Sequence, residues 1–331
     1  MQKIYFRADA GVNIGFGHFI RSLALADMLK DEFDCVFYTA EPTPYQIGEM
    51  QKVCPYVSLS ETTKFEDFLE ELDGTEIVVL DNYFYTTKYQ REIKAKGCKL
   101  VCIDDMHEKH YVADAVINHA PGTKESMFSK EEYTQLYLGP EYLLLRKQFR
   151  EVMHSYTPFE KNENVYICYG GCDEENLTRK ACEVIMQICP RHIDVVVGGA
   201  YVYYDDLIEY AQGKNISVCR NASPEKIVEL LGNACLAIVP DSMVFFEVCC
   251  LRRPCITGYD CDNQMFIAEY NRRHHLGCEI GNLLEDYEAK LSKAYMRMTV
   301  KEGEEYIKNQ KVIIGDTADK LSNVFRNLKN K

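Results

Sequence analysis

Short apolar runs rich in Val, Ile, Leu and Tyr alternate with longer amphipathic segments along almost the whole chain. This alternation is typical of βα units built around parallel sheets. In the first half, the runs that predict strands are 3–7, 35–39, 76–80, 99–103 and 115–118. In the second half they are 165–169, 193–198, 216–219, 235–239 and 255–257. Helices are expected in the intervals.

The length of 331 residues predicts about two domains. A polar stretch that contains Pro158, residues 155–164, has the composition of a linker, and the alternation restarts after it. We therefore expect an α/β protein of two Rossmann-like domains, residues 1–154 and 164–331, with parallel sheets that face each other across a cleft. The closing helices are expected to complete the fold, and the last one to cross back to the first domain.

Charge and composition exclude several classes of partner. A net charge of −13 opposes binding to nucleic acid or to an anionic membrane surface. Apolar runs stay well short of the roughly 18 residues that a membrane span needs, so we expect a cytoplasmic protein without a stable membrane anchor. The fifteen cysteines form no C-x-x-C pair, and an odd number scattered through apolar segments favours buried, reduced thiols over a disulfide framework.

The first expected strand enters a glycine-punctuated loop, Ile14-Gly15-Phe16-Gly17-His18, that opens directly into an apolar-periodic helix. Such a loop lets backbone N–H groups and a helix N-terminus approach a bound anion. His18 lies where the loop becomes helix, and its imidazole is suited to general acid or base chemistry. The alternative is a histidine that opens the helix and only hydrogen-bonds to the loop.

Two loops of the second half have a related pattern. Gly170 and Gly171 follow a strand and would let the backbone approach a diphosphate, while Asp173 either caps the next helix or contacts the ligand. The segment lacks the G-x-G-x-x-G fingerprint and the lysine of a P-loop, so it does not indicate NAD or ATP chemistry.

The other of these two loops follows the expected strand 235–239, and it leads into a helix that carries Ser242 and Glu247. Ser242 is placed to donate to a phosphate and Glu247 to accept from ribose hydroxyls. The alternative for Glu247 is a solvated or salt-bridged helix residue. Asn263 and Gln264 begin a further helix, as expected at a rim that recognises sugar or amide groups.

Taken in order, the motifs of this chain resemble the UDP-sugar hydrolase family of pseudaminic acid biosynthesis. The resemblance rests on Arg7-Ala8-Asp9, Ile14-Gly15-x-Gly17-His18, Leu80-Asp81-x-Tyr83, Ile103-Asp104-Asp105, Leu138-Gly139-Pro140-x-Tyr142-x-Leu144-Leu145-Arg146, Gly170-Gly171-x-Asp173-x-x-Asn176 and Asn263-Gln264. It spans nearly the whole chain, and the order of the motifs is more specific than any one of them.

The resemblance implies the GT-B fold, which that family shares with the UDP-GlcNAc-using transferase of peptidoglycan synthesis. It implies release of UDP from UDP-2,4-diacetamido-2,4,6-trideoxy-β-L-altropyranose by water, with no metal required. His18 would be the catalytic group, and Tyr83 and Asn263 would line the sugar site.

The mechanism implied places UDP on the second domain, where the expected contacts are Gly170, Gly171, Asp173, Ser242 and Glu247. His18 would deprotonate the attacking water. UDP is a good leaving group, so backbone dipoles are expected to stabilise the departing diphosphate. The residues expected to bind the substrate or orient the histidine are Arg7, Asp9, Gly17, Asp81, Tyr83, Asp105, Asn263 and Gln264.

Three alternatives stay open at this point. A GT-B glycosyltransferase would use the same UDP-sugar pocket and pass the sugar to an acceptor instead of water. A non-catalytic sugar-nucleotide-binding protein would bind without turnover. A metal site would draw on the acidic and histidine residues of one polar region, namely Asp104, Asp105, His107, His110 and His119.

Overall fold

The computed structural model describes residues 1–11, 14–155, 158–159, 162–313 and 315–329. The chain divides into two compact units. Unit 1 comprises Met1–Lys147 and Asp316–Lys331, and unit 2 comprises Gln148–Gly315. Within the stretch 155–164 that was expected to link two domains, residues 156–157 and 160–161 lie outside the described residues.

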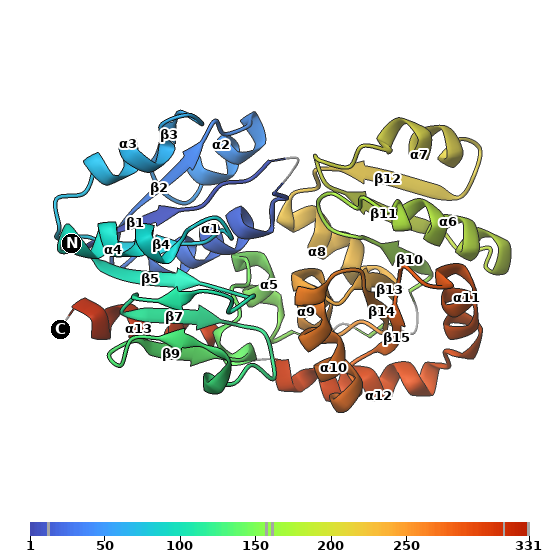
Figure 1. Ribbon diagram of the computed structural model, residues 1–331. Helices are drawn as coiled ribbons and strands as arrows, with labels where there is room; N and C mark the ends of the chain where they lie inside the picture. The colour runs from blue at the N-terminus through green and yellow to red at the C-terminus, as the bar shows by residue number, and fades with distance from the viewer. Residues whose placement is uncertain (12–13, 156–157, 160–161, 314, 330–331) are drawn as a thin grey trace. The chain divides into compact units, whose positions relative to one another are not determined.

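Unit 1 is built on a 7-stranded sheet (Figure 1). Its strands are β1 (Lys3–Arg7), β2 (Asp34–Ala40), β3 (Tyr56–Leu59), β4 (Ile77–Leu80), β5 (Lys99–Ile103), β7 (Ala115–Asn118) and β9 (Gln135–Leu138). They run parallel in the order β3-β2-β1-β4-β5-β7-β9. A separate pair joins β6 (His110–Tyr111) to β8 (Ser129–Lys130). The order reverses direction between β1 and β4, so the switch point of the sheet lies there.

Helices alternate with the strands of unit 1, and two of them start at threonine caps. They are α1 (Gly17–Leu29), α2 (Pro44–Gln51), α3 (Lys64–Glu70), α4 (Thr87–Ala95) and the C-terminal α13 (Thr317–Lys329), with short 3-10 turns at Glu125–Met127 and Pro140–Tyr142. Thr43 and Gln46 form a capping box that starts α2, and Thr86 caps α4 through the backbone N–H of Tyr89.

Two apolar layers cover the sheet of unit 1. One joins α1 to α13, where Leu25 and Leu29 share a cluster with Leu321 and Phe325. The other holds Phe68 of α3 together with side chains of α4. The last helix, red in Figure 1, therefore packs on the core of the unit that contains the first strand.

Unit 2 repeats the architecture with a 6-stranded parallel sheet. Its strands are β10 (Asn164–Ile167), β11 (Ile193–Val197), β12 (Ile216–Arg220), β13 (Ala234–Pro240), β14 (Cys255–Tyr259) and β15 (Cys278–Asn282). Their order is β12-β11-β10-β13-β14-β15, so this sheet has its switch point between β10 and β13.

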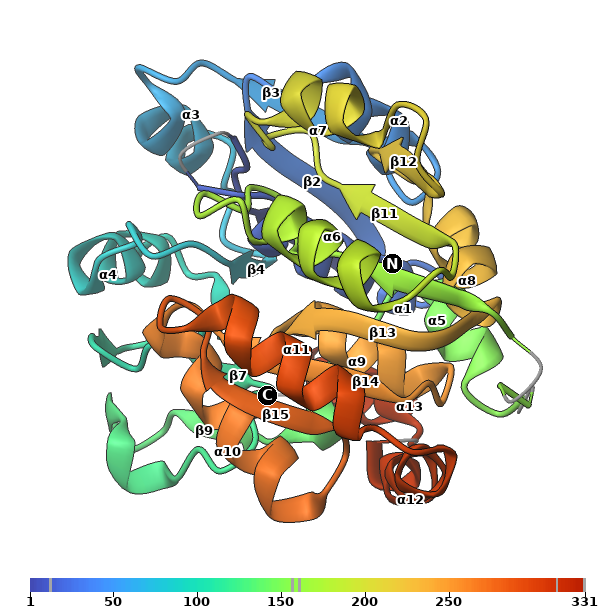
Figure 2. The same ribbon diagram turned by 90° about the vertical axis from the view of Figure 1, so that its right-hand side faces the viewer.

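The helices of unit 2 are α5 (Lys147–Val152), α6 (Leu177–Ile188), α7 (Tyr204–Ala211), α8 (Pro224–Gly232), α9 (Met243–Cys250), α10 (Met265–His274), α11 (Tyr287–Arg297) and α12 (Val300–Gln310). Short 3-10 turns cover Asp262–Gln264 and Lys311–Ile313. In Figure 2, α6 and α11 lie side by side over one face of the sheet, where their apolar side chains share one core cluster with the strands. The predicted α/β class with parallel sheets is confirmed.

The predicted strands and the observed ones differ mainly at the sheet edges. All ten predicted strands are present, three of them with the predicted bounds and the others with ends moved by one or two residues. The strands β3, β9 and β15 were not predicted, and each lies at an edge of its sheet; the two short strands of the separate β6–β8 pair were not predicted either. An edge strand is partly solvated and therefore carries polar residues that break the apolar run. All fifteen cysteines are free thiols, and most are buried.

Candidate active site

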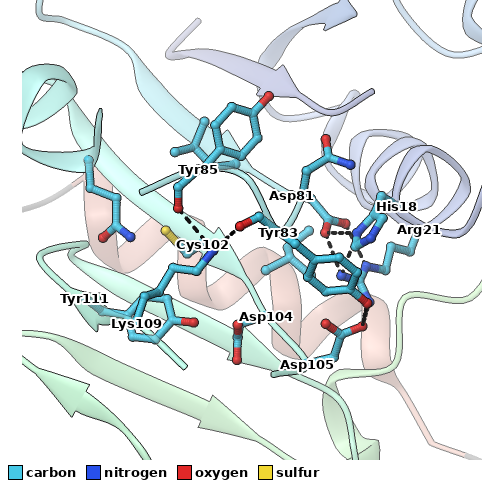
Figure 3. A pocket seen from close by; sticks show the side chains of 14 residues that line it. His18, Arg21, Asp81, Tyr83, Tyr85, Cys102, Asp104, Asp105, Lys109 and Tyr111 are labelled. Carbon is cyan, nitrogen blue, oxygen red and sulfur yellow. Dashed lines mark hydrogen bonds and ion pairs between the residues drawn. The ribbon is translucent and has the colours of Figure 1, made fainter. Parts of the chain in front are cut away.

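A pocket in unit 1 lies at the C-terminal ends of the central strands, beside the switch point between β1 and β4 (Figure 3). In open parallel sheets this is the position where ligands bind. Three chain segments meet there. His18 and Arg21 come from the first two turns of α1, Asp81 follows β4 directly, and Asp105 lies just after β5.

His18 and Asp81 form a buried pair. The Nδ1 atom of His18 lies 2.7 Å from Oδ1 of Asp81, and the two residues are 5% and 1% exposed. Asp81 also accepts hydrogen bonds from Nε of Arg21 at 2.7 Å, from Nη2 of Arg21 at 2.6 Å and from Oγ of Ser22 at 3.0 Å. Burial alone would raise the pKa of Asp81, but the charges of Arg21 and then His18 outweigh it and hold that pKa well below its usual value. The carboxylate is therefore ionised.

The ionised state of Asp81 decides which nitrogen of His18 carries the proton. The Nδ1 atom also lies 3.0 Å from Nη2 of Arg21, so two partners compete for it. A lone pair on Nδ1 would face a carboxylate oxygen at 2.7 Å, which is repulsive, whereas an N–H there makes a charge-assisted hydrogen bond. We therefore assign the proton to Nδ1. This leaves the lone pair on Nε2, the atom through which the ring can accept a proton.

Arg21 joins Asp81 to a second carboxylate. Its Nη1 donates to Oδ2 of Asp105 at 2.9 Å, and the hydroxyl of Tyr83 donates to the same oxygen at 3.2 Å. The ring of Tyr83 stands edge-on to His18, with centroids 4.6 Å apart and an interplanar angle of 86°. Burial opposes ionisation of Asp105, but Arg21 and next His18 lower its pKa. Its other oxygen, Oδ1, has no hydrogen-bond partner among the described residues.

Lys109 holds the loop that carries Tyr83. Its ammonium donates to the carbonyl oxygens of Tyr83 at 2.9 Å and Tyr85 at 3.0 Å (Figure 3). Tyr83 itself is 49% exposed, so its ring covers the pocket from the solvent side. The loop position thus depends on a contact between segments after two neighbouring strands.

Arg7 and Asp9, which were expected to contact the substrate, do not line this pocket. Their side chains are buried and form an ion pair with each other, and Lys64 adds a contact to Asp9 at 3.0 Å. Asp9 also accepts from the backbone N–H of Ala40 at 2.8 Å and donates its own N–H to Asn82 at 2.7 Å. These contacts make the pair a scaffold for the loops around the pocket.

Gly17 is the first residue of α1 and lies next to His18. Apart from its chain neighbours and the backbone of its own helix, a Cβ at this position would meet no described atom within 4 Å. The space beside Gly17 is therefore open, and its expected role near the substrate stays a prediction.

The histidines considered for a metal site do not share a common partner in the structure. His107 donates its backbone N–H to Asp104, and His110 contacts Ser129 and Glu131. His119 is buried, and burial and then the charge of Arg21 lower its pKa to about 4. Within the described part of the chain, no group of three or more His, Cys, Asp or Glu residues is arranged to hold a metal ion.

In unit 2 the loop after β10 lies at that sheet's switch point. Gly170 has a φ of 80°, which favours glycine, and a Cβ at Gly198 would collide with the backbone of Gly171. The two carboxylate oxygens of Asp173 accept from the N–H groups of Leu177 and Thr178, each at 2.8 Å. Of its two expected roles, Asp173 therefore fills the capping one, and it occupies donors that an anion would use.

The loop after β13 flanks the same switch point. Ser242 caps α9 by accepting from the N–H of Val244 at 3.3 Å. Glu247 is only 7% exposed, so it is not a solvated helix residue. Asp241 is fully buried, and its Oδ1 accepts from Asn271 at 3.2 Å. Burial raises the pKa of Asp241 to about 7, with Thr257 and Asn271 opposing that effect.

Asn263 and Gln264 belong to unit 2, in the 3-10 turn that precedes α10. Oδ1 of Asn263 accepts from the thiol of Cys261 at 2.9 Å, and Oε1 of Gln264 accepts from the N–H of Asp260 at 3.0 Å. Gln264 thus stabilises its own turn. The expected role of both residues toward a sugar stays a prediction.

Arg21 and Lys109 are functional candidates that sequence reasoning missed. Arg21 follows His18 by three residues on a helix, which places both side chains on the same face. A cation buried in an otherwise apolar helix is a signal that could have identified it. Lys109 lies in a polar loop, where nothing in the pattern distinguishes it from a solvated lysine.

No family model matches the chain. An uncharacterised protein of Methanocaldococcus jannaschii is 25% identical over 320 residues, which are 91% of this chain and 61% of that protein. The chain therefore spans less than two thirds of that relative. The spore coat polysaccharide biosynthesis protein SpsG of Bacillus subtilis is 24% identical over 269 residues, 79% of this chain and 78% of SpsG. UDP-2,4-diacetamido-2,4,6-trideoxy-beta-L-altropyranose hydrolase of Campylobacter jejuni is 28% identical over 185 residues, 53% of this chain and 63% of the hydrolase.

Solved structures identify the fold. MurG of Acinetobacter baumannii superposes with a TM-score of 0.65 at 11% identity, covering 99% of this chain and 100% of MurG. HepE of Anabaena, in complex with UDP and glucose, gives a TM-score of 0.65 at 12% identity and covers both chains fully, 100% of each. The chain has the GT-B fold. In the part of the chain that the structure describes, no helix is long and apolar enough to cross a membrane.

Proposed function

We propose that the protein is a nucleotide-sugar hydrolase that releases UDP from a UDP-linked sugar by attack of water. The observation that carries the proposal is the His18–Asp81 pair, buried at the switch point of unit 1 with Nε2 of His18 left to accept a proton. A base held by an ionised carboxylate is the arrangement that general-base catalysis needs. Support for the substrate class comes from the hydrolase relative of Campylobacter jejuni.

In the proposed reaction, Nε2 of His18 takes a proton from water while the water oxygen bonds to the anomeric carbon of the sugar. The bond between that carbon and the phosphate oxygen breaks, and UDP leaves with the electron pair. Asp81 stabilises the imidazolium that forms, because its carboxylate contacts the protonated Nδ1. The proton then leaves to solvent, and the free sugar and UDP are released.

We assign the sugar to the His18 pocket, with Tyr83 and Asp105 as its first contacts. Tyr83 is exposed beside His18, and the buried Oδ1 of Asp105, which has no partner among the described residues, would accept from a sugar hydroxyl or amide. The nucleotide is assigned to unit 2, at the loops after β10 and β13. Gly170 and Gly171 would approach the diphosphate, and Ser242 and Glu247 would contact phosphate and ribose.

For the sugar itself we propose a diacetamido-trideoxy hexose of the kind that precedes a nonulosonic acid such as pseudaminic acid. The relative whose printed name states this substrate shares 28% identity with part of the chain. The same pocket would serve a glycosyltransferase if an acceptor hydroxyl replaced water. The similarity to SpsG, which is named for spore coat polysaccharide biosynthesis, supports this alternative.

One experiment tests the proposal. The purified protein is incubated with UDP-, GDP- and CMP-sugars in water enriched in heavy oxygen, and mass spectrometry follows nucleotide and sugar. We expect UDP release from a UDP-sugar without an acceptor, with the heavy oxygen in the anomeric hydroxyl. Label in the phosphate of UDP would mean that a phosphorus–oxygen bond breaks, and the mechanism would be wrong. Turnover that requires an added sugar acceptor would identify a transferase.

A further inference from the structure

We propose that Arg21 is the positioning residue of the His18 base, and that it acts through Asp81 and Asp105 together. The inference rests on the proposed function, since it assigns Nε2 of His18 as the base. Arg21 is 5% exposed and lies three residues after His18 on α1. It would not touch the substrate, and its effect would pass through the two carboxylates.

The guanidinium of Arg21 uses its planar set of donors on two carboxylates that follow neighbouring strands. Nε and Nη2 form a bidentate pair with Asp81, at 2.7 and 2.6 Å, and Nη1 reaches Asp105 at 2.9 Å. Two buried carboxylates close together repel each other, and a cation between them offsets that repulsion by attracting both. The fork therefore keeps both side chains ionised and sets the distance between the ends of β4 and β5.

The bidentate contact also sets the plane of the Asp81 carboxylate. With Nε on Oδ2 and Nη2 on Oδ1, the carboxylate cannot rotate without losing a charge-assisted hydrogen bond. Its Oδ1 is thereby held 2.7 Å from Nδ1 of His18. A lysine at this position would keep the charge but offer a point contact in place of the fork. The proton on Nδ1, and so the lone pair on Nε2, depends on that geometry.

The third donor of Arg21 orients the ring beside the base. Oδ2 of Asp105 is shared between Nη1 of Arg21 and the hydroxyl of Tyr83. Tyr83 is thereby held edge-on to His18, which limits the tilt of the imidazole. Arg21 thus controls the base from two sides, through Asp81 at Nδ1 and through Asp105 and Tyr83 at the ring face (Figure 3).

The test compares Arg21→Lys with Arg326→Lys as the matched control. Arg326 also pairs with a carboxylate of unit 1, that of Glu32, but does so at the surface and away from the pocket. We expect Arg21→Lys to lower kcat about a hundredfold with KM within about threefold, as for loss of base orientation. Arg326→Lys should keep the activity of the parent protein.

Two further readouts separate positioning from a structural role. The ¹⁵N shifts of His18, assigned with the variant His18→Asn, report which ring nitrogen carries the proton in the neutral ring. The parent protein should show the proton on Nδ1, and Arg21→Lys should show a mixture. In the Asp81→Asn background, Arg21→Lys should lower kcat by much less than the roughly hundredfold loss expected in the parent protein, because the path through Asp81 is already cut and only the path through Asp105 remains.

An unchanged kcat in Arg21→Lys, or an unchanged position of the proton, would overturn the inference. So would a double variant whose fold-loss in kcat equals the product of the losses in Arg21→Lys and Asp81→Asn. If Arg21→Lys does not fold, the charge-balanced double variant Arg21→Gln with Asp105→Asn takes its place. Only the ¹⁵N readout is used for it, because Asp105 is also assigned to contact the sugar, and a mixture of the two proton positions is again expected. Because the ¹⁵N measurement needs no substrate, it tests Arg21 even if no UDP-sugar is hydrolysed. That last result would count against the proposed function alone.

Discussion

Nδ1 of His18 lies 2.7 Å from Oδ1 of Asp81, although 63 residues separate the two in the chain. The contact forms because α1 begins beside the end of β1 and Asp81 follows β4, the strand that pairs with β1. The parallel sheet thus brings a helix-opening histidine and a strand-ending carboxylate to the same edge. An ionised partner at this distance orients the ring and offsets the charge that the ring gains during proton transfer.

The substitution His18→Asn should remove the base and leave the fold intact. We expect turnover to fall by about two to four orders of magnitude with UDP affinity kept. His110→Asn, a half-buried histidine of the same unit that contacts Ser129 and does not line the pocket, is the control and should keep activity. Turnover and melting temperature are measured on one preparation. A stable variant with near-parental hydrolysis would contradict the mechanism, whereas a low melting temperature with turnover per folded molecule intact would mean a structural histidine.

Asp81→Asn preserves shape but replaces an acceptor with an amide that can donate to Nδ1. The neutral ring would then carry its proton on Nε2, so kcat should drop by about two to four orders of magnitude. Asp73→Asn, at an exposed turn of unit 1, serves as the reference for the loss of one carboxylate. Steady-state kinetics at saturating substrate check this prediction. Retention of more than about a tenth of kcat would show that Asp81 does not set the protonation of His18.

Glu247→Ala should weaken UDP binding by about tenfold, since a hydrogen bond to a charged group contributes roughly 1.5 kcal/mol or more. Glu247→Gln keeps the buried packing and removes only the charge, so it separates lost contact from a disturbed α9. Glu269→Ala, an exposed glutamate of α10 that pairs with Arg273, is the control. Titration calorimetry with UDP gives the three affinities. An unchanged affinity in both Glu247 variants would remove this residue from the nucleotide site.

Asp241 predicts a pH dependence of stability. Its pKa in the folded state is about 7, above the usual value of 3.8, so the folded protein binds a proton that the unfolded chain releases. The stabilisation of the folded state that comes from this proton is therefore fully present below pH 4 and is lost as the pH rises through 7. Because one pKa unit corresponds to about 1.4 kcal/mol, the loss is on the order of 4 kcal/mol.

Urea unfolding at pH 5 and pH 8 measures this effect. The free energy of unfolding of the parent protein should fall between pH 5 and pH 8. That of Asp241→Asn should fall less, because an amide does not titrate. Asp206→Asn, an exposed position on α7, should shift the free energy of unfolding by the same amount at both values. A parent protein and Asp241→Asn with parallel pH profiles would mean that Asp241 is ionised throughout.

Interior strands could be predicted because they are buried on both faces. The apolar runs 100–103 and 115–117 lie within the predicted strands 99–103 and 115–118, and the structure has strands with these bounds. The runs at β3 and β15 could not be recognised, because each forms a sheet edge where part of the strand is solvated. The position of His18 at a loop-to-helix junction was equally readable, because glycines and helix periodicity are local signals.

By itself the sequence determined the alternation of strands and helices, the loops that follow the central strands, and the histidine at the start of the first helix. Only the tertiary structure decided which carboxylate pairs with that histidine, because the order of strands in a sheet is set by long-range packing. Burial then decided the chemistry. Arg7 and Asp9 form a buried ion pair, and Asp173 caps the helix that follows it. Arg21 lies between Asp81 and Asp105 and donates hydrogen bonds to both. A charge can be read from the chain, but its partner and its pKa depend on the neighbours that folding brings to it.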